Sequence, residues 1–276
     1  MMGETSAVGS DLRDENRRLE AIIRQLSEER WSLPTPAEGW TIAHQIGHLH
    51  WTDRMSLLAI DEPEEFRLVG EQHDREPNHF VDKEAIAAAA VKPSDLLHHW
   101  VATRDVLATR LEELDPKTAI PWFGPPMRPL SMLTARLMET WAHGRDITDT
   151  LQITQQPTSA LRHIAHLGVR TRNFSFQLRG LQVPTPEVYV ELTGPNGEQW
   201  SWGPPEAPDA VCGPAEDFCL LVTQRRHRDD LNLKAVGSTA KIWLTIAQAF
   251  AGKATPGRPP AQMSASPDSG SVSACS

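Results

Sequence analysis

The chain has 276 residues, a formal net charge of −9 and 39% hydrophobic residues. This composition is typical of a globular protein, and at about 100–200 residues per domain it predicts two domains. The negative charge argues against general binding to nucleic acid or to an anionic membrane, because both need a basic face. No run approaches about 18 uninterrupted apolar residues and the N-terminus has no apolar signal region, so we expect a cytoplasmic protein.

The first half of the chain has the pattern of a helical bundle. Apolar residues recur at helical spacing in four stretches, which capping residues open and prolines interrupt. The polar residues 64–79 are predicted to form an irregular loop. Four helices with such connections predict a four-helix bundle over residues 1–156. The four helices are expected to begin at Ser10, Thr41, Ser94 and about Leu130.

After Pro157 the pattern changes to one of mixed helices and strands. Residues 188–193 alternate in the manner of a strand, and Asn196-Gly197 is a strong hairpin signal. We therefore predict an α+β domain over residues 157–252 and a disordered tail over residues 253–276, which are rich in Pro, Gly, Ser and Ala. The other strands are expected at 199–202, 209–212 and 231–236, and the helices at 159–172, 214–223 and 238–250.

Two segments of the bundle carry residue types that bind metals. His44 and His48 are four positions apart, as are Glu139 and His143, so each pair lies on one face of a predicted helix. Helical bundles often build metal sites from such pairs on facing helices. Imidazole and carboxylate ligands without thiolates suit Zn²⁺, with Ni²⁺ and Fe²⁺ left open. Spacing alone also fits ordinary helix-surface contacts.

The string Gly39-Trp40-Thr41-Ile42, followed by Gly47-His48-Leu49, resembles the hallmark of the DinB-like superfamily. It is most similar to the mycothiol-dependent maleylpyruvate isomerase group, whose last bundle helix carries a Glu-xxx-His-xx-Asp element, here Glu139, His143 and Asp146. The resemblance implies a DinB-like bundle with His48, Glu139 and His143 as metal ligands. Residues 200–203, 213–217 and 220–225 resemble that group's C-terminal α+β domain, which is of sterol-carrier-like type.

The resemblance also implies a thiol-dependent enzyme. Mycothiol is the implied cosubstrate, and a metal-bound thiol loses its proton at neutral pH although a free thiol has a pKa of about 8.5. The implied activity is thiol exchange or sulfur transfer, or isomerisation of a small electrophile, including reactions of lincosamide-type antibiotic biosynthesis. An arginine of the C-terminal domain belongs to the active site in that group. The predicted catalytic residues are Arg225 or Arg226, His44 and Asp53, and the predicted cosubstrate-binding residues are Arg225 and Trp202.

Two other kinds of function stay open at this stage. A metal-dependent hydrolase would use water in place of the thiol. A non-catalytic protein would keep the metal for stability and bind a ligand. The aromatic residues Trp122, Phe123, Trp200 and Trp202 fit either a surface for a bulky substrate or ordinary packing. We expect a small thiol and a small electrophile as partners, with neither nucleic acid nor membrane, and a monomer or homodimer.

Overall fold

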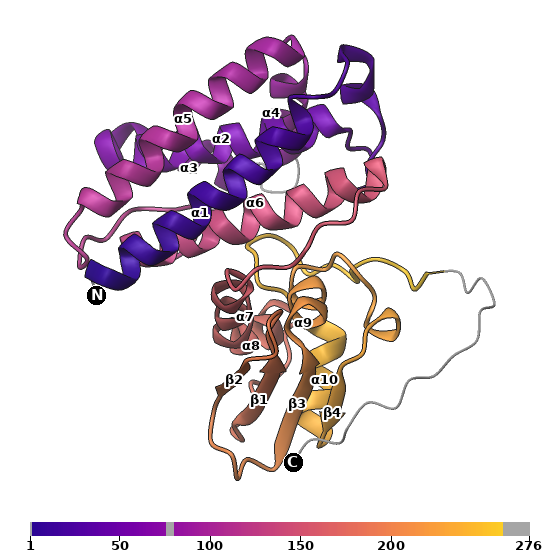
Figure 1. Ribbon diagram of the computed structural model, residues 1–276. Coiled ribbons are helices and arrows are strands. Elements are labelled where there is room, and N and C mark those ends of the chain that lie inside the picture. Colours follow the sequence, from indigo (N-terminus) through magenta and orange to yellow (C-terminus); the bar gives the residue numbers. More distant parts are fainter. Residues whose placement is uncertain (1, 76–79, 262–276) are drawn as a thin grey trace. The chain divides into compact units, whose positions relative to one another are not determined.

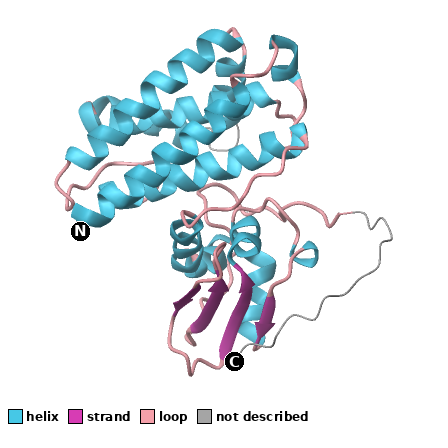
Figure 2. Ribbon diagram, viewed as in Figure 1, coloured by secondary structure: helices cyan, strands magenta, loops and turns pink. Residues whose placement is uncertain are grey.

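The computed structural model describes residues 2–75 and 80–261, which fall into two compact units, Met1–Gln155 and Gln156–Ser276 (Figure 1). The first unit is built of helices, and the described strands form a sheet in the second (Figure 2). The chain is therefore a two-domain α+β protein, as its sequence predicts.

Four long helices of the first unit form the expected bundle. They are α1 (Met2–Ile23), α2 (Ile42–Asp61), α5 (Pro93–Glu113) and α6 (Pro129–Leu151), and α1 and α2 each contact both α5 and α6. Helix α1 begins earlier than predicted, so Ser10 lies inside it and does not cap it. Thr41 is the N-cap of α2, as predicted.

A helix lies where a loop is predicted. Helix α3 spans Pro63–Arg75, within the predicted loop, while residues 76–79 lie outside the described residues. Helix α4, Phe80–Ala89, follows that loop, and both helices lie beside α2. The loop prediction was wrong for α3 because this helix is polar overall and buries only Phe66, so its few apolar residues do not stand out in the sequence. Its exposed side is stabilised by ion pairs of Arg67 with Glu64 and Glu71, one turn away in each direction.

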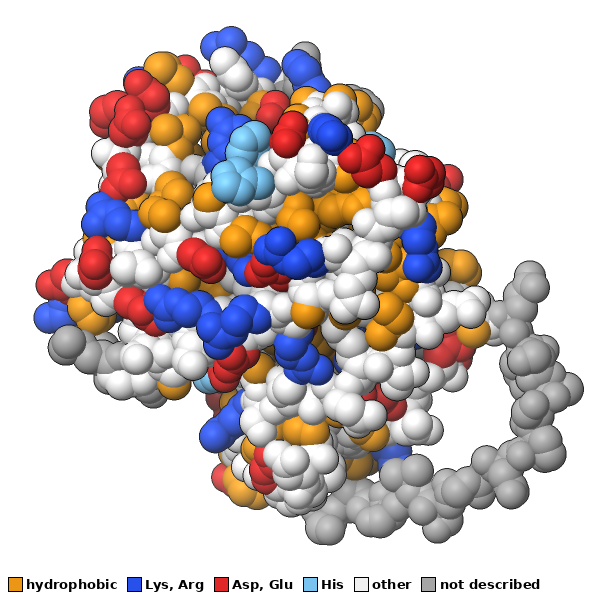
Figure 3. Space-filling model, turned by 45° about the horizontal axis from the view of Figure 1, so that its top comes forward, with side chains coloured by type: hydrophobic (Ala, Val, Ile, Leu, Met, Phe, Trp, Pro, Cys, Tyr) orange, Lys and Arg blue, Asp and Glu red, His pale blue; other side chains and the backbone are white. Residues whose placement is uncertain are grey.

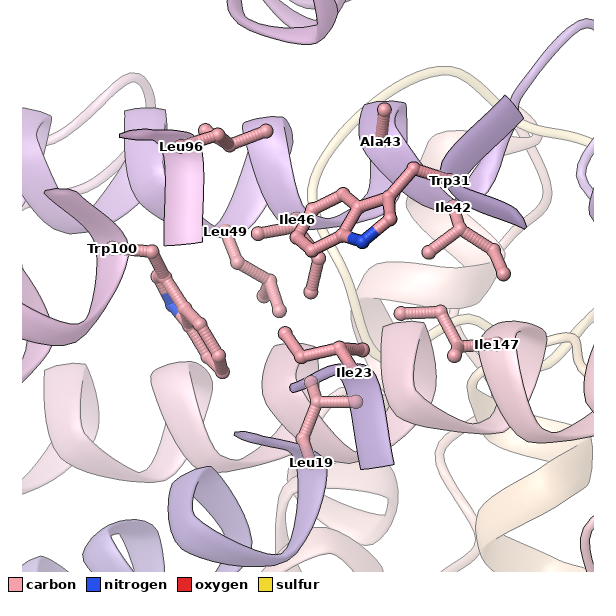
Figure 4. Close-up of a cluster of buried hydrophobic side chains, with 10 residues drawn as sticks. All are labelled: Leu19, Ile23, Trp31, Ile42, Ala43, Ile46, Leu49, Leu96, Trp100 and Ile147. Carbon is pink, nitrogen blue, oxygen red and sulfur yellow. The ribbon is translucent and has the colours of Figure 1, made fainter. Parts of the chain in front are cut away.

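A cluster of buried apolar side chains fixes α2 against its neighbours. Figure 4 shows Ile46 and Leu49 of α2 packed among residues of α1, α5 and α6. Both side chains are fully buried. Because Ile46 and Leu49 flank His48 along the chain, this core determines how the helix presents that histidine. The cluster consists of Leu19, Ile23, Trp31, Ile42, Ala43, Ile46, Leu49, Leu96, Trp100 and Ile147.

The second unit contains a four-stranded sheet in the order β2-β1-β3-β4. Strands β1 and β2 form the predicted hairpin, with Gly197 at a φ of 85° in its turn, and β1 pairs in parallel with β3. The strands are β1 (Val188–Thr193), β2 (Gln199–Trp202), β3 (Asp209–Pro214) and β4 (Lys234–Val236). The helices are α7 (Leu161–Arg170), α8 (Arg172–Leu178), α9 (Ala215–Val222) and α10 (Ser238–Ile246).

The start of the predicted tail is held against the second unit. The Arg258 guanidinium donates to the Arg225 carbonyl at 2.9 Å, and the backbone N–H of Ala261 donates to the Asp230 carboxylate. Residues 253–261 thus include polar contacts with the second unit that composition does not reveal, and residues 262–276 lie outside the described part of the chain. Among the described helices, none is both long and apolar enough to cross a membrane.

Candidate metal site

Three side chains from α2 and α6 converge in the bundle. His48, Glu139 and His143 each offer a ligand atom, and these atoms lie within 4.8 Å of one another. The Glu139 Oε2 atom is 3.0 Å from His143 Nε2 and 3.5 Å from His48 Nε2. All three side chains are at least three-quarters buried, so their contacts are only weakly screened by water.

The start of α2 is fixed by a reciprocal cap. The ring of His44 takes a hydrogen bond from the Thr41 backbone N–H at 3.2 Å, and its Nδ1 lies 2.8 Å from the Thr41 hydroxyl. Burial lowers the pKa of His44, with Asp82 opposing the shift, so its neutral ring accepts at this helix end. His44 therefore has a capping role in the structure, and its predicted catalytic role stays a prediction.

Gln45 holds the second histidine from the opposite side. Its side chain is fully buried, and its Oε1 atom is hydrogen-bonded to His143 Nδ1. Neutral imidazole has a proton on one nitrogen and a lone pair on the other. When Nδ1 donates to Gln45, the Nε2 lone pair faces the Glu139 carboxylate at 3.0 Å.

This arrangement needs positive charge at its centre. Burial by itself raises the pKa of Glu139, but hydrogen bonds and charge interactions with His143 and His48 outweigh it and hold the pKa well below its usual range. Glu139 is therefore ionised at neutral pH. A carboxylate oxygen beside two nitrogen lone pairs is repulsive, so either protonated rings or a bound cation must stabilise the cluster.

The donor set fits a divalent metal ion. In a tetrahedral zinc site with bonds of about 2.0–2.2 Å, neighbouring ligand atoms are about 3.3 Å apart, close to the separations of Glu139 from the two histidines. Three protein ligands leave a further position for water or substrate, which is the arrangement of catalytic zinc sites.

Aromatic side chains form walls around the cluster. The Trp40 ring lies 5.9 Å from His143 in a stacked arrangement and 5.5 Å from His48. Its indole N–H donates to Asp82 at 3.2 Å, which ties the loop before α2 to α4. Trp51, 6.1 Å from His48, stacks on Phe123. Phe123 thus lies in an aromatic cluster of the first unit, together with Phe66, Phe80 and Trp122.

Asp53 lies in a different environment from its predicted one. It is 5% exposed, and its carboxylate accepts a hydrogen bond from Arg136 Nε of α6 at 2.9 Å. Burial raises the pKa of Asp53, and the charge of Arg136 opposes that shift. The observed contact is a buried ion pair between two helices, so proton transfer by Asp53 has no support from the geometry and stays a prediction.

The remaining predicted residues lie in the second unit. Trp202 on β2 donates its indole N–H to His166 Nδ1 at 3.1 Å. Arg225 and Arg226 follow α9, and both donate to nearby carbonyl oxygens. Arg226 also lines a pocket of about 200 Å³. Three further basic side chains, His227, Arg228 and Arg258, line the same pocket, together with the acidic Asp229.

A larger surface groove, of about 580 Å³, lies between α2 and α5. His50, His98 and His99 line it, and none of the three clustered ligands does. On the face shown in Figure 3, basic and acidic side chains are interspersed around patches of apolar and histidine side chains. Because none of the clustered ligands lines it, the groove is separate from the candidate metal site.

Comparison with known proteins places this site in a family. The model of the mycothiol maleylpyruvate isomerase N-terminal domain matches residues 12–148, which contain the whole cluster. Two proteins of Mycobacterium tuberculosis, described as uncharacterized and from strains CDC 1551 and H37Rv, are 50% identical over 257 residues, or 93% of this chain and 99% of theirs. The first unit of the chain belongs to the mycothiol maleylpyruvate isomerase N-terminal domain family.

Other comparisons concern the fold and the second unit. A crystal structure of the mycothiol-dependent maleylpyruvate isomerase aligns with a TM-score of 0.54 and 14% identity, covering 86% of this chain and 93% of that one. A histidine-to-alanine mutant of that enzyme aligns with a TM-score of 0.55 and 13% identity. At such identities the likeness shows a shared fold. A model described as wyosine base formation matches residues 184–234 of the second unit.

Sequence reasoning missed two polar residues that shape the site, Gln45 and Arg136. Gln45 lies between the two parts of the motif, next to His44, and its place three positions before His48 was a usable signal. Arg136 lies three positions before Glu139 on α6, but its partner Asp53 is far away in the sequence. Such a pairing emerges only when the two helices are packed together.

Proposed function

We propose that this protein is a metal-dependent enzyme that uses a low-molecular-weight thiol, mycothiol, to isomerise a small electrophilic substrate or to transfer sulfur to it. The observation that carries the proposal is the buried cluster of His48, Glu139 and His143, whose ligand atoms converge within 4.8 Å of one another. Family membership supports mycothiol as the thiol, since the matching structures are described as mycothiol-dependent isomerases.

The three residues of the cluster have different roles in binding a divalent cation. His48 and His143 supply neutral nitrogen ligands, and Glu139 supplies the charge that favours a divalent cation over a monovalent one. A divalent ion bound there supplies a Lewis acid that lowers the pKa of a coordinated thiol. The rings of Trp40 and Trp51 restrict water on two sides of the cluster and so strengthen its electrostatic interactions. Zinc is the metal we propose.

The second unit offers a site for an anionic group. The pocket beside Arg226 is lined by three guanidinium groups, those of Arg226, Arg228 and Arg258, and by one acidic side chain, Asp229. A guanidinium forms paired hydrogen bonds with carboxylates. We propose that Arg226, with Arg225 beside it, binds a carboxylate of the substrate or of the thiol.

The proposal is tested by calorimetric titration of mycothiol into the zinc-loaded protein, the zinc-stripped protein and the zinc-treated His143→Ala variant. We expect binding in the zinc-loaded protein alone, because the thiol needs the cation to be held as its anion. Equal binding in all three samples, or in none, would contradict the proposal. Conversion of maleylpyruvate by the loaded protein with mycothiol then separates isomerisation from sulfur transfer, in which the product keeps the thiol.

Two alternative functions, a metal-dependent hydrolase and a non-catalytic binding protein, predict different results. Zinc binding and ester or amide hydrolysis without any thiol would indicate a metal-dependent hydrolase. Zinc binding with neither thiol binding nor turnover would indicate a non-catalytic protein. A role in lincosamide-type biosynthesis, a cytoplasmic location and a monomeric or homodimeric state stay predictions from the sequence.

A further inference from the structure

The two histidines of the cluster are held differently. His143 Nδ1 is hydrogen-bonded to Gln45, whereas His48 Nδ1 is buried and has no hydrogen-bond partner among residues 2–75 and 80–261. A ligand histidine whose second nitrogen is engaged has a fixed tautomer and a fixed ring orientation. A side-chain hydrogen bond therefore fixes the ring orientation of His143, whereas the ring orientation of His48 depends on how the helices pack.

The contact with Gln45 is part of a chain of hydrogen bonds with a defined direction. The Trp40 carbonyl can only accept, and it receives the Thr35 hydroxyl at 2.9 Å. The Thr35 oxygen then accepts from Gln45 Nε2 at 2.8 Å. With Nε2 so placed, Gln45 presents Oε1 to His143, and only a protonated Nδ1 can donate to that oxygen.

The reverse orientation of the amide satisfies fewer groups. If Gln45 turned its Oε1 towards Thr35, the single hydroxyl proton of Thr35 would be shared between Gln45 and Trp40. His143 would then carry its proton on Nε2, where it would donate to Glu139 and block metal coordination. The observed network thus selects the one tautomer that suits a metal ligand.

We propose that Gln45 is a positioning residue that keeps the proton of His143 on Nδ1, through the chain that starts at the Trp40 carbonyl, and so leaves Nε2 free for the metal. This inference rests on the metal-dependent function proposed above. Gln45 acts through His143 and need not touch the substrate. Thr35 is the intermediate link, and its loss should matter less because Gln45 can still accept from His143.

The zinc affinity of variants tests this role. We expect Gln45→Leu to weaken zinc binding about 10–100-fold, the usual effect of losing an outer hydrogen-bond partner, and Thr35→Val to weaken it less. Gln45→Glu, which keeps an acceptor oxygen, should restore most of the affinity. Ser56→Ala is the matched control, because Ser56 is also fully buried on α2 and bonds to the Thr52 carbonyl away from the cluster. Competition with a chromophoric chelator measures each affinity, and circular dichroism checks that each variant is folded.

A second readout does not depend on the metal. Nitrogen-15 spectra of the histidine rings in the metal-free protein at alkaline pH should show the His143 proton on Nδ1, and a mixture of tautomers in Gln45→Leu. A wild-type His143 protonated on Nε2 alone, or unchanged zinc affinity in a folded Gln45→Leu variant, would overturn the proposal. If the wild type binds no zinc, the function proposed above fails, and the ring spectra still decide whether Gln45 sets the tautomer.

Discussion

Helices α2 and α6 meet at two buried polar contacts of opposite character. At one, the Asp53 carboxylate of α2 and the Arg136 guanidinium of α6 form an ion pair at 2.9 Å, in which the two charges neutralise each other. At the other, His48 of α2 faces Glu139 and His143 of α6, and the ionised Glu139 is balanced by either protonated rings or a bound cation. Both contacts join the same two helices, yet only the second has a donor set that suits a bound cation. This difference separates a contact that maintains the fold from one that binds a ligand.

The largest effect should follow when the ion pair of Asp53 and Arg136 is broken. In Asp53→Ala the buried Arg136 guanidinium loses its carboxylate, and we expect the free energy of unfolding to fall by about 3–5 kcal/mol. Urea denaturation of the metal-free protein measures this loss. The double variant Asp53→Leu with Arg136→Met should recover most of the stability, because it removes both charges together. A loss below about 1 kcal/mol in Asp53→Ala would mean that the pair does not hold these helices together.

The cluster of His48, Glu139 and His143 should respond in the opposite way. Glu139→Gln removes the charge that attracts a cation, so zinc affinity should fall by more than about 100-fold, beyond the effect of losing an outer hydrogen bond. Stability of the metal-free variant should change by no more than about 1 kcal/mol, because the amide also relieves the crowding of lone pairs. Equilibrium dialysis against zinc and urea denaturation measure the two quantities. A destabilisation as large as that of Asp53→Ala would erase the distinction between the two contacts.

A third buried charge lies between these extremes. Glu15 of α1 is 4% exposed, and its carboxylate lies 3.8 Å from the Arg18 guanidinium. Burial raises the pKa of Glu15 above its usual value, and Arg18 and Arg145 oppose that shift. The folded state therefore binds this proton more tightly than the unfolded state does, and Glu15 lowers stability as the pH rises through the window between the two pKa values.

Glu15→Gln should remove that pH-dependent loss. We expect the variant to be more stable than the wild type at pH 7 by no more than about 1 kcal/mol, and to lose this advantage as the pH falls below about 4.5, where the wild-type carboxyl is protonated in both states. Thermal unfolding at a series of pH values measures the difference. A variant that is less stable than the wild type at pH 7 would show that Arg18 fully compensates this carboxylate.

Much of this molecule could be predicted from the sequence because its signals are local. The apolar stripes of α1, α2, α5 and α6 and the Asn196-Gly197 hairpin are all visible within single segments. The cluster of His48, Glu139 and His143 was foreseen from two spacings and a family resemblance, and the structure brings the three side chains together. Its role as a metal site stays a proposal.

What the sequence left out depends on contacts between distant segments. Helix α3 was missed because it is polar overall and buries a single side chain, Phe66. Gln45 looks like any polar residue on a helix until His143 is placed beside it. For the same reason Asp53 was assigned to catalysis, because nothing near it in the sequence indicates that Arg136 is its partner.

The distance along the chain between the clustered side chains has a thermodynamic consequence. His48 and Glu139 are roughly ninety residues apart, so one ion bound to both closes a loop that contains much of the first unit. In the chain-entropy description of cross-links, closing a loop of that length disfavours the unfolded chain by about 4–5 kcal/mol. An ion bound there would act as a reversible cross-link between α2 and α6. Removing it with a chelator would lower the stability of the bundle as well as abolish activity that depends on the metal.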